Sequence, residues 1–152
     1  MTVVSNVVDG TIVASVEVDA PPDEVFRAIS SPEICEWWGS DDHYRVTNWV
    51  GDVRPGGAWT CEAKNANGTD VSVVRGEFIT VDPPHLLVHT WCPSWENFAA
   101  TTVRYDIVPT TRGSRVNVTH TGFTEAAASS GHANGWVRVL GWLREHFPAA
   151  VE

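Results

Sequence analysis

Basic residues are scarce in this chain of 152 residues. Ten lysines and arginines stand against nineteen aspartates and glutamates, which leaves a formal net charge of −9, and Lys64 is the one lysine. Binding to a nucleic-acid backbone or to an anionic membrane depends on clustered positive charge. The composition therefore argues against a nucleic-acid partner and against docking on a membrane.

Cysteines and long apolar runs are also few. Three cysteines are an odd number, without metal-site or disulfide-framework spacing. We therefore expect no metal and no other cofactor. No segment approaches the roughly 20 apolar residues that span a bilayer, and the first ten residues lack the basic start and apolar run of a signal peptide. We expect a cytoplasmic protein.

Tryptophan, in contrast, is abundant. The chain has eight, against five phenylalanines and two tyrosines. An indole combines a large apolar body with a single N–H donor. Eight of them predict either a strongly aromatic core or a cavity walled by indoles. Trp37 and Trp38 raise the question most sharply, because adjacent helical residues point about 100° apart and cannot share one face.

Hydrophobic periodicity predicts an α+β fold in one domain over residues 1–152, with its core at about 10–147. β-branched residues alternate in a first strand, and two short helices follow, the second capped by Ser31 and ending at Gly39. The chain then alternates strands and turns before one long C-terminal helix. The expected strands are 11–18, 43–50, 58–63, 71–81 (with Gly76 as a candidate bulge), 86–92, 100–108 and 114–123, and the expected helices are 19–30, 31–38 and 124–147.

Glycines and alternation refine this picture. Gly131, Gly135 and Gly141 weaken the long helix, and such a helix often has a packing or ligand reason to lack side chains. Two strands alternate cleanly between apolar and polar residues, so one face of the sheet should be covered by the long helix. The residues expected on that face are Val103, Tyr105, Ile107, Val116, Val118 and His120.

Five segments together resemble a known superfamily. They are "APPDEVFRAISSPE…WW" (20–38), "GDVRPGGAW" (51–59), "RGEFITVDPPHLLVHTW" (75–91), "VNVTHTGF" (116–123) and "HANGWVRVLGWL" (132–143). In this order and spacing they resemble the SRPBCC (START-like) superfamily, and within it the family named after the C-terminal domain of the activator of the heat-shock-protein-90 ATPase. The resemblance covers roughly residues 10–147.

The resemblance implies a helix-grip fold. In that fold a curved antiparallel sheet of about six to seven strands wraps around the long C-terminal helix, and two short helices after the first strand close an elongated apolar cavity. His89 departs from the family pattern, which more usually has an aromatic residue there.

Strand register and the resemblance together select candidate residues. Those expected to line the cavity are Trp37, Trp38, Trp59, Phe78, Leu87, His89, Trp91, Val103, Tyr105, Val118, His120, Trp136 and Leu140. At least one of the paired indoles should line the entrance. His89, His120 and Tyr105 are also the candidates for acid–base catalysis, because histidine titrates near neutral pH. The competing interpretation makes each histidine a hydrogen-bonded core residue and each indole simple packing.

Three functions remain open. The first is binding of an apolar or aromatic small molecule, lipid-like or polyketide-like, because ligand sites are concave and mostly apolar. The second is an enzyme that resembles polyketide cyclases and dehydratases. The third, implied by the family name alone, is a co-chaperone-like regulator of a heat-shock ATPase. Chaperone-binding members act partly through a separate N-terminal domain, which we expect to be absent here because the first expected strand begins at residue 11. We expect the first function, in a monomer or homodimer.

Overall fold

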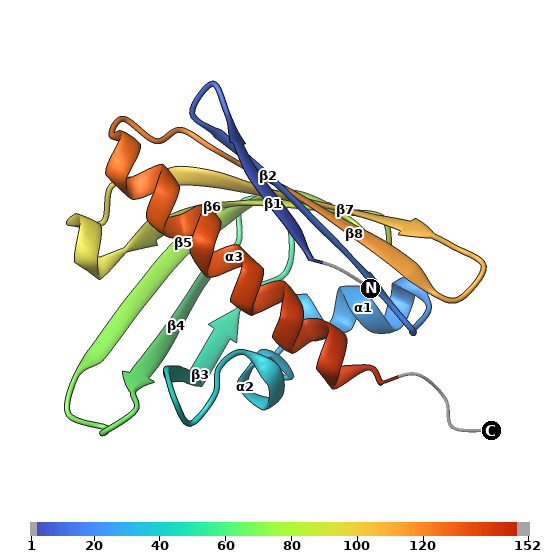
Figure 1. Ribbon diagram of the computed structural model, residues 1–152, viewed down its shortest axis with the longest axis horizontal. Helices are drawn as coiled ribbons and strands as arrows, with labels where there is room; N and C mark the ends of the chain where they lie inside the picture. The colour runs from blue at the N-terminus through green and yellow to red at the C-terminus, as the bar shows by residue number, and fades with distance from the viewer. Residues whose placement is uncertain (1–2, 149–152) are drawn as a thin grey trace.

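The computed structural model describes residues 3–148 and forms an eight-stranded antiparallel sheet that curves around one long helix (Figure 1). The sheet order is β1-β2-β8-β7-β6-β5-β4-β3. In chain order the elements are β1 (Val4–Val8), β2 (Thr11–Val18), α1 (Pro22–Ile29), α2 (Ile34–Trp37), β3 (Tyr44–Gly51), β4 (Ala58–Asn65), β5 (Val71–Asp82), β6 (Leu86–Pro93), the 3-10 helix η1 (Ser94–Glu96), β7 (Thr101–Pro109), β8 (Ser114–Thr121) and α3 (Ala126–His146). The expected α+β, helix-grip architecture is confirmed.

The sheet has one strand more than expected. β1 pairs antiparallel with β2 across a turn at Asp9 and Gly10, whose φ angles are 51° and 79°. An Asp-Gly pair with two positive φ angles is typical of a tight hairpin. Val4, Val7 and Val8 of β1 are all exposed, so β1 lacks the alternation that reveals a half-buried strand.

The second short helix is a single turn and begins later than expected. α2 starts at Ile34, and the Ser31 hydroxyl accepts a hydrogen bond from the Glu33 N–H at 3.2 Å in the turn before it. The chain leaves α2 through Gly39, which has a φ of 136°. A side chain there would collide with the carbonyl of Tyr44, so this exit requires glycine.

The expected bulge lies elsewhere on β5. Gly76 pairs regularly with Trp59, and the register shift falls between Phe78 and Thr80. Gly76 has a different role, because a Cβ atom there would lie 2.6 Å from Trp59 Nε1 and would collide with the Thr90 carbonyl. Glycine at this position therefore lets the Trp59 indole fold down onto the sheet.

The core lies on the concave face of the sheet, under α3. The six alternating residues predicted for the inner face of β7 and β8 are all buried. From α3, the apolar residues Ala133, Trp136, Val139, Leu140 and Leu143 are buried. The helix packs most closely on β2 and β1, so this half of the sheet is filled and the β3–β6 half lies farther from the helix.

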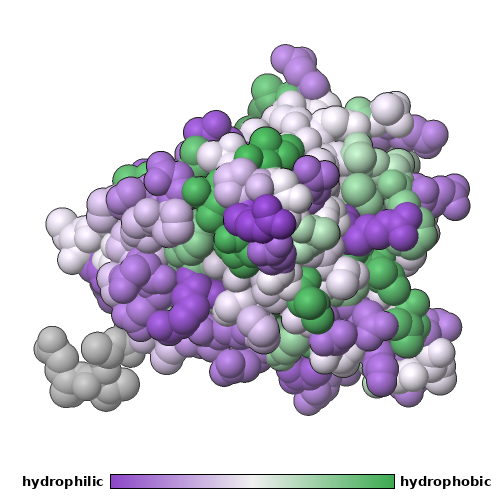
Figure 2. Space-filling view, turned by 180° about the vertical axis from the view of Figure 1, so that it is seen from behind, coloured by the Kyte–Doolittle hydropathy of each residue, from purple (hydrophilic) through white to green (hydrophobic). Residues whose placement is uncertain are grey.

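Apolar surface on the outside is broken into small areas. Figure 2 shows hydrophobic patches separated by hydrophilic residues on the side opposite to the view of Figure 1. Val13, Val50, Ile79 and Val108, which come from four different strands, are among the exposed apolar residues. Within residues 3–148, no helix has the length and apolar character needed to cross a bilayer.

Candidate functional site

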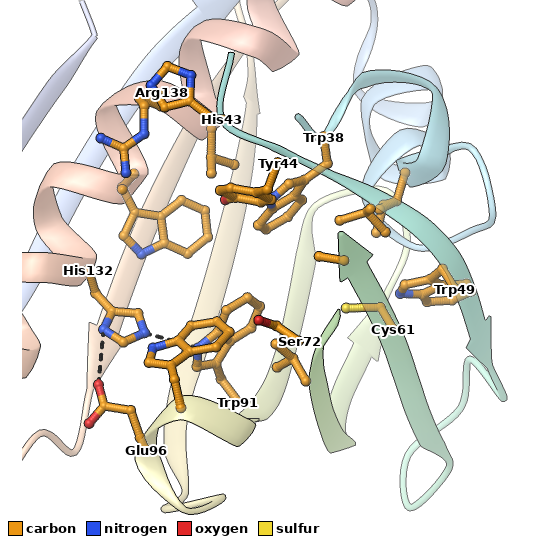
Figure 3. Close-up of a pocket in the computed structure, with 18 of the residues that line it drawn as sticks. Trp38, His43, Tyr44, Trp49, Cys61, Ser72, Trp91, Glu96, His132 and Arg138 are labelled. Carbon is orange, nitrogen blue, oxygen red and sulfur yellow. Dashed lines mark hydrogen bonds and ion pairs between the residues drawn. The ribbon is translucent and has the colours of Figure 1, made fainter. Parts of the chain in front are cut away.

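A cavity of about 640 Å³ lies between the β3–β6 half of the sheet and α3. Its size is in the range of sites for small organic molecules. Figure 3 shows side chains from the strands, from α3 and from the end of α2 converging on it. The apolar and aromatic residues that line it include Ile29, Ile34, Trp38, Val46, Trp49, Trp59, Val74, Phe78, Trp91, Tyr105, Trp136 and Val139.

Two glycines on α3 create much of this space. Gly131 and Gly135 are one helical turn apart and both line the cavity. A Cβ atom added at either position would meet no atom within 4 Å. Glycine lowers helix stability by about 1 kcal/mol relative to alanine. The cavity therefore lies beside two α3 positions that have no side chain, at a cost to the stability of the helix.

Stacked indoles form the wall nearest to α2. The Trp38 ring lies 6.0 Å from that of Trp91 at an interplanar angle of 18°, and 6.0 Å from that of Trp136 at 60°. Trp59 continues the series, with its ring 6.0 Å from that of Trp91. Such offset and tilted contacts are the favoured arrangements of aromatic rings, so the wall has a defined shape.

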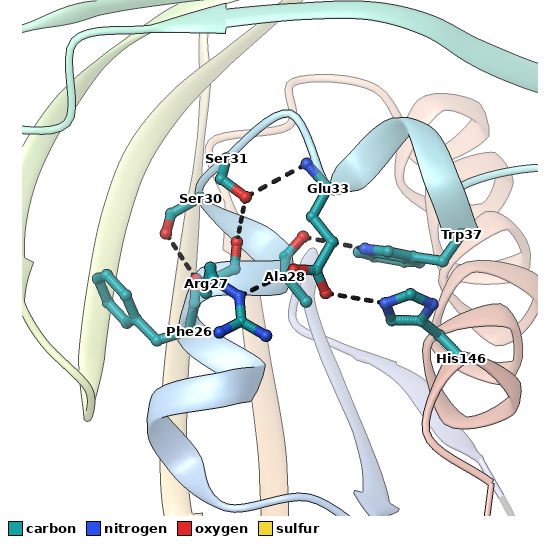
Figure 4. Close-up of polar contacts among 8 residues, drawn as sticks. All are labelled: Phe26, Arg27, Ala28, Ser30, Ser31, Glu33, Trp37 and His146. Atoms are coloured by element: carbon teal, nitrogen blue, oxygen red, sulfur yellow. Dashed lines mark hydrogen bonds and ion pairs between the residues drawn. The ribbon is translucent and has the colours of Figure 1, made fainter.

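The adjacent tryptophans divide between two tasks. Trp38 lines the cavity, and its Nε1–H donates to the Tyr44 hydroxyl at 3.2 Å. Trp37 is not among the lining residues and is buried against α1, where its Nε1–H donates to the Ala28 carbonyl at 2.9 Å (Figure 4). The two rings lie 5.2 Å apart at an interplanar angle of 35°, so one indole lines the cavity while the other packs behind it in the α1–α2 junction.

The same junction is tied to the end of α3. The Glu33 carboxylate accepts from Arg27 Nε at 2.9 Å and from His146 Nε2 at 2.8 Å (Figure 4). Burial raises the pKa of Glu33, but the hydrogen bonds from His146 and Arg27 outweigh burial and leave it below its usual value. Glu33 therefore links both short helices to the long one at this end of the molecule.

Both ring nitrogens of His120 are engaged in a chain of buried hydrogen bonds outside the cavity. The indole N–H of Trp136 donates to His120 Nδ1 at 3.1 Å, so the proton must be on Nε2. Nε2–H donates to the Thr101 hydroxyl at 2.7 Å, and that hydroxyl donates to the Trp91 carbonyl at 3.1 Å. Burial lowers the pKa of His120 to about 3, with a smaller contribution from nearby His132. This arrangement matches the core-histidine interpretation.

His89 is buried at the cavity wall and keeps one nitrogen unused. Its Nδ1–H donates to the Thr90 carbonyl at 2.8 Å, which leaves a lone pair on Nε2. Within residues 3–148, Nε2 has no hydrogen-bond partner. It is also not among the unpaired side-chain atoms that are fully buried, so it remains accessible. Burial lowers the pKa of His89 to about 4, so the ring is neutral at pH 7.

Tyr105 and Trp59 lie beside His89. Their rings are 5.9 Å and 4.9 Å from the imidazole, respectively. The Tyr105 hydroxyl has no protein partner among the described residues, and burial raises its pKa, so it is neutral too. Trp59 Nε1 is the one fully buried side-chain nitrogen or oxygen without a hydrogen-bond partner in that part of the chain. It lies next to Gly76.

His132 is a cavity residue that sequence reasoning missed. Its Nε2 accepts from the indole N–H of Trp91 at 3.2 Å, and its Nδ1–H donates to the Ala128 carbonyl at 2.9 Å. Trp95 stacks on the imidazole at 6.1 Å, and Glu96 Oε1 lies 3.7 Å from Nδ1. His132 therefore links α3 to β6 and η1 across one end of the cavity. Its position beside Gly131 was the available signal.

The structure divides the predicted cavity residues into two groups. Seven line the cavity: Trp38, Trp59, Phe78, His89, Trp91, Tyr105 and Trp136. The other six are not among the lining residues, which corrects the expectation for them: Trp37, Leu87, Val103, Val118, His120 and Leu140. The last five of these face inward as predicted, but they pack in the core of the sheet and helix. Within residues 3–148, no group of three or more metal-ligating side chains occurs.

Solved structures of similar shape come from several bacteria. A protein from Rhodobacter sphaeroides superposes with a TM-score of 0.82 at 19% identity, covering 96% of this chain and 97% of that one. The AHSA1 protein from Silicibacter pomeroyi gives 0.76 at 23%, covering 90% and 96%. DynU16 gives 0.74 at 18%, covering 91% of this chain and 47% of that one. At these identities the likeness establishes the fold alone.

The family is established by comparison of the sequence. Comparison with the curated proteins found no match. The family model described as "Activator of Hsp90 ATPase homolog 1-like protein" matches residues 19–147, which include α1 and α2, the sheet from β3 to β8, and α3. This chain belongs to the family of activator of Hsp90 ATPase homolog 1-like proteins.

Proposed function

We propose that this protein binds an apolar, largely aromatic small molecule in the cavity between β3–β6 and α3. The observation that carries the proposal is the cavity itself, with a volume of about 640 Å³ and walls of stacked indoles. Removing apolar area from water contributes about 25 cal/mol per Å². An indole wall adds ring contacts of the kind that an aromatic ligand can continue.

A cyclase-like enzyme is the second candidate. DynU16, one of the structures of similar fold, is described as a putative protein in the dynemicin biosynthetic locus. In this chain the unpaired Nε2 of His89 is the group that could accept a proton from a bound molecule. A general base works best with a pKa near the working pH. Since burial lowers the pKa of His89 to about 4, binding is better supported than turnover.

Native mass spectrometry of protein purified from cells tests the proposal most directly. We expect a co-purifying small molecule, or, after its removal, saturable binding of the neutral fluorophore N-phenyl-1-naphthylamine at one site per chain. A protein that is empty as purified and does not bind the fluorophore would overturn the proposal. An empty protein that instead captures a chaperone would favour the co-chaperone alternative.

The paired indoles should respond differently to substitution. Trp37→Phe removes the donor to the buried Ala28 carbonyl, and leaving such a group unpaired costs about 1–3 kcal/mol. We expect a corresponding loss of unfolding free energy in urea, with fluorophore affinity within about twofold of wild type. Trp38→Phe should weaken the fluorophore at least fivefold with a smaller loss of stability, because Trp38 lines the cavity. The reverse pattern would contradict the division of tasks.

A further inference from the structure

Two polar groups with unused hydrogen-bonding capacity lie together in the aromatic part of the cavity. His89 on β6 and Tyr105 on β7 are 6% and 3% exposed, and both line the cavity. Their rings are 5.9 Å apart. Neither His89 Nε2 nor the Tyr105 hydroxyl has a protein partner within residues 3–148, yet neither is sealed from the cavity. Buried polar groups are ordinarily paired.

The hydrogen-bonding character of this pair is fixed by geometry. Because the Nδ1–H of His89 is committed to the Thr90 carbonyl, the neutral ring presents only an acceptor at Nε2. A phenol can both donate and accept, so Tyr105 complements whatever group bonds to His89. The other ring contacts of His89 here are aromatic, at 4.9 Å to Trp59 and 6.1 Å to Phe78.

Charged side chains lie elsewhere on the cavity wall. Lys64, Asp70 and Arg138 are exposed, and Glu96 is half-buried beside His132. In the described part of the chain, the one cation that lies over an aromatic ring is Arg75, on Phe98, and no charged side chain is hydrogen-bonded to His89 or Tyr105. A carboxylate placed at His89 would bring lone pairs against a lone pair and would lose its hydration without a countercharge.

We propose that the cavity selects an uncharged aromatic molecule that carries a hydroxyl group, whose O–H donates to His89 Nε2 and whose oxygen accepts from the Tyr105 hydroxyl. This inference rests on the proposed function and adds the polar chemistry of the ligand. It assigns His89 the task of recognising a hydrogen-bond donor inside an otherwise apolar part of the site.

Three naphthalene probes test the inference by isothermal titration calorimetry at pH 7.5. We expect 2-naphthol to bind at least tenfold more tightly than naphthalene, because only the naphthol satisfies the pair, and at least tenfold more tightly than 2-naphthoate. His89→Phe should abolish the preference for naphthol while naphthalene binding stays within threefold. Tyr105→Phe should reduce the preference by at least threefold and serves if the first variant fails to fold.

His85→Phe is the matched control, because His85 is exposed and is not among the lining residues. It should keep the full naphthol preference. Equal affinities for naphthol and naphthalene, or a preference that survives both cavity variants, would overturn the inference and leave the proposed function intact. So would tightest binding of 2-naphthoate that Arg138→Gln abolishes. Failure of all three probes to bind would instead count against the proposed function.

Discussion

Acidification from pH 7 to 4.5 is expected to lower the free energy of unfolding by about 5 kcal/mol, roughly 2–3 kcal/mol for each of two histidines. Burial lowers the pKa of His89 to about 4 and that of His120 to about 3, against an ordinary value of 6.5. Between these values the unfolded chain binds a proton at each site and the folded chain does not. Stability is therefore complete above pH 6.5 and declines as the pH falls toward 4.

Urea unfolding followed by tryptophan fluorescence at several pH values measures this loss. His89→Phe should remove about half of the decline between pH 6.5 and 4.5, since it eliminates one of the two buried neutral imidazoles. His85→Phe, an exposed histidine replaced in the same way, should leave the decline unchanged. A free energy of unfolding that is flat across this window in the wild-type protein would contradict the neutral, buried state of both rings.

The fold could be predicted well because its signals are local. The alternation over 11–18 predicted the bounds of β2, and the helix expected over 124–147 matches α3 to within two residues at each end. β1 was missed because its exposed valines do not alternate. α2 was expected to be longer, because Ser31 and Pro32 have the form of a helix start but form only the turn before it.

The site was harder to predict because alternation identifies a face of the sheet, not a position along it. Leu87, Val103 and Val118 share the inner face with His89 and Tyr105. Which of them meet open space depends on α3, which packs on β2 and β1 and stands off from β3–β6. This placement of α3 over the sheet arises from contacts between distant parts of the chain and leaves no local pattern in the sequence.

Two further features of the site were not predicted, also because they depend on contacts between separate parts of the chain. His132 and Trp91 are 41 residues apart, and their hydrogen bond exists only once α3 is docked. Whether Trp37 or Trp38 turns inward depends on a carbonyl of α1. In both cases the residue type was informative, since buried indole N–H groups need acceptors, but the acceptor could not be located from spacing.

Gly135→Leu should raise stability and abolish binding at the same time. Replacing a glycine in a helix interior contributes about 1 kcal/mol, and nothing lies within 4 Å of the new Cβ atom. We therefore expect a melting temperature about 2–4 °C higher. The added side chain also enters the cavity and competes with the fluorophore. The affinity for N-phenyl-1-naphthylamine should fall at least 30-fold. Thermal unfolding and fluorophore titration on the same samples measure both effects.

Gly141→Leu is the matched control. Gly141 is also on α3, also has nothing within 4 Å of an added Cβ atom, and is not among the lining residues. It should gain similar stability with fluorophore affinity within about twofold of wild type. Equal affinities in the two leucine variants would place the bound fluorophore outside the cavity. A loss of affinity confined to Gly135→Leu would instead show that the fluorophore occupies the space that Gly135 leaves beside α3.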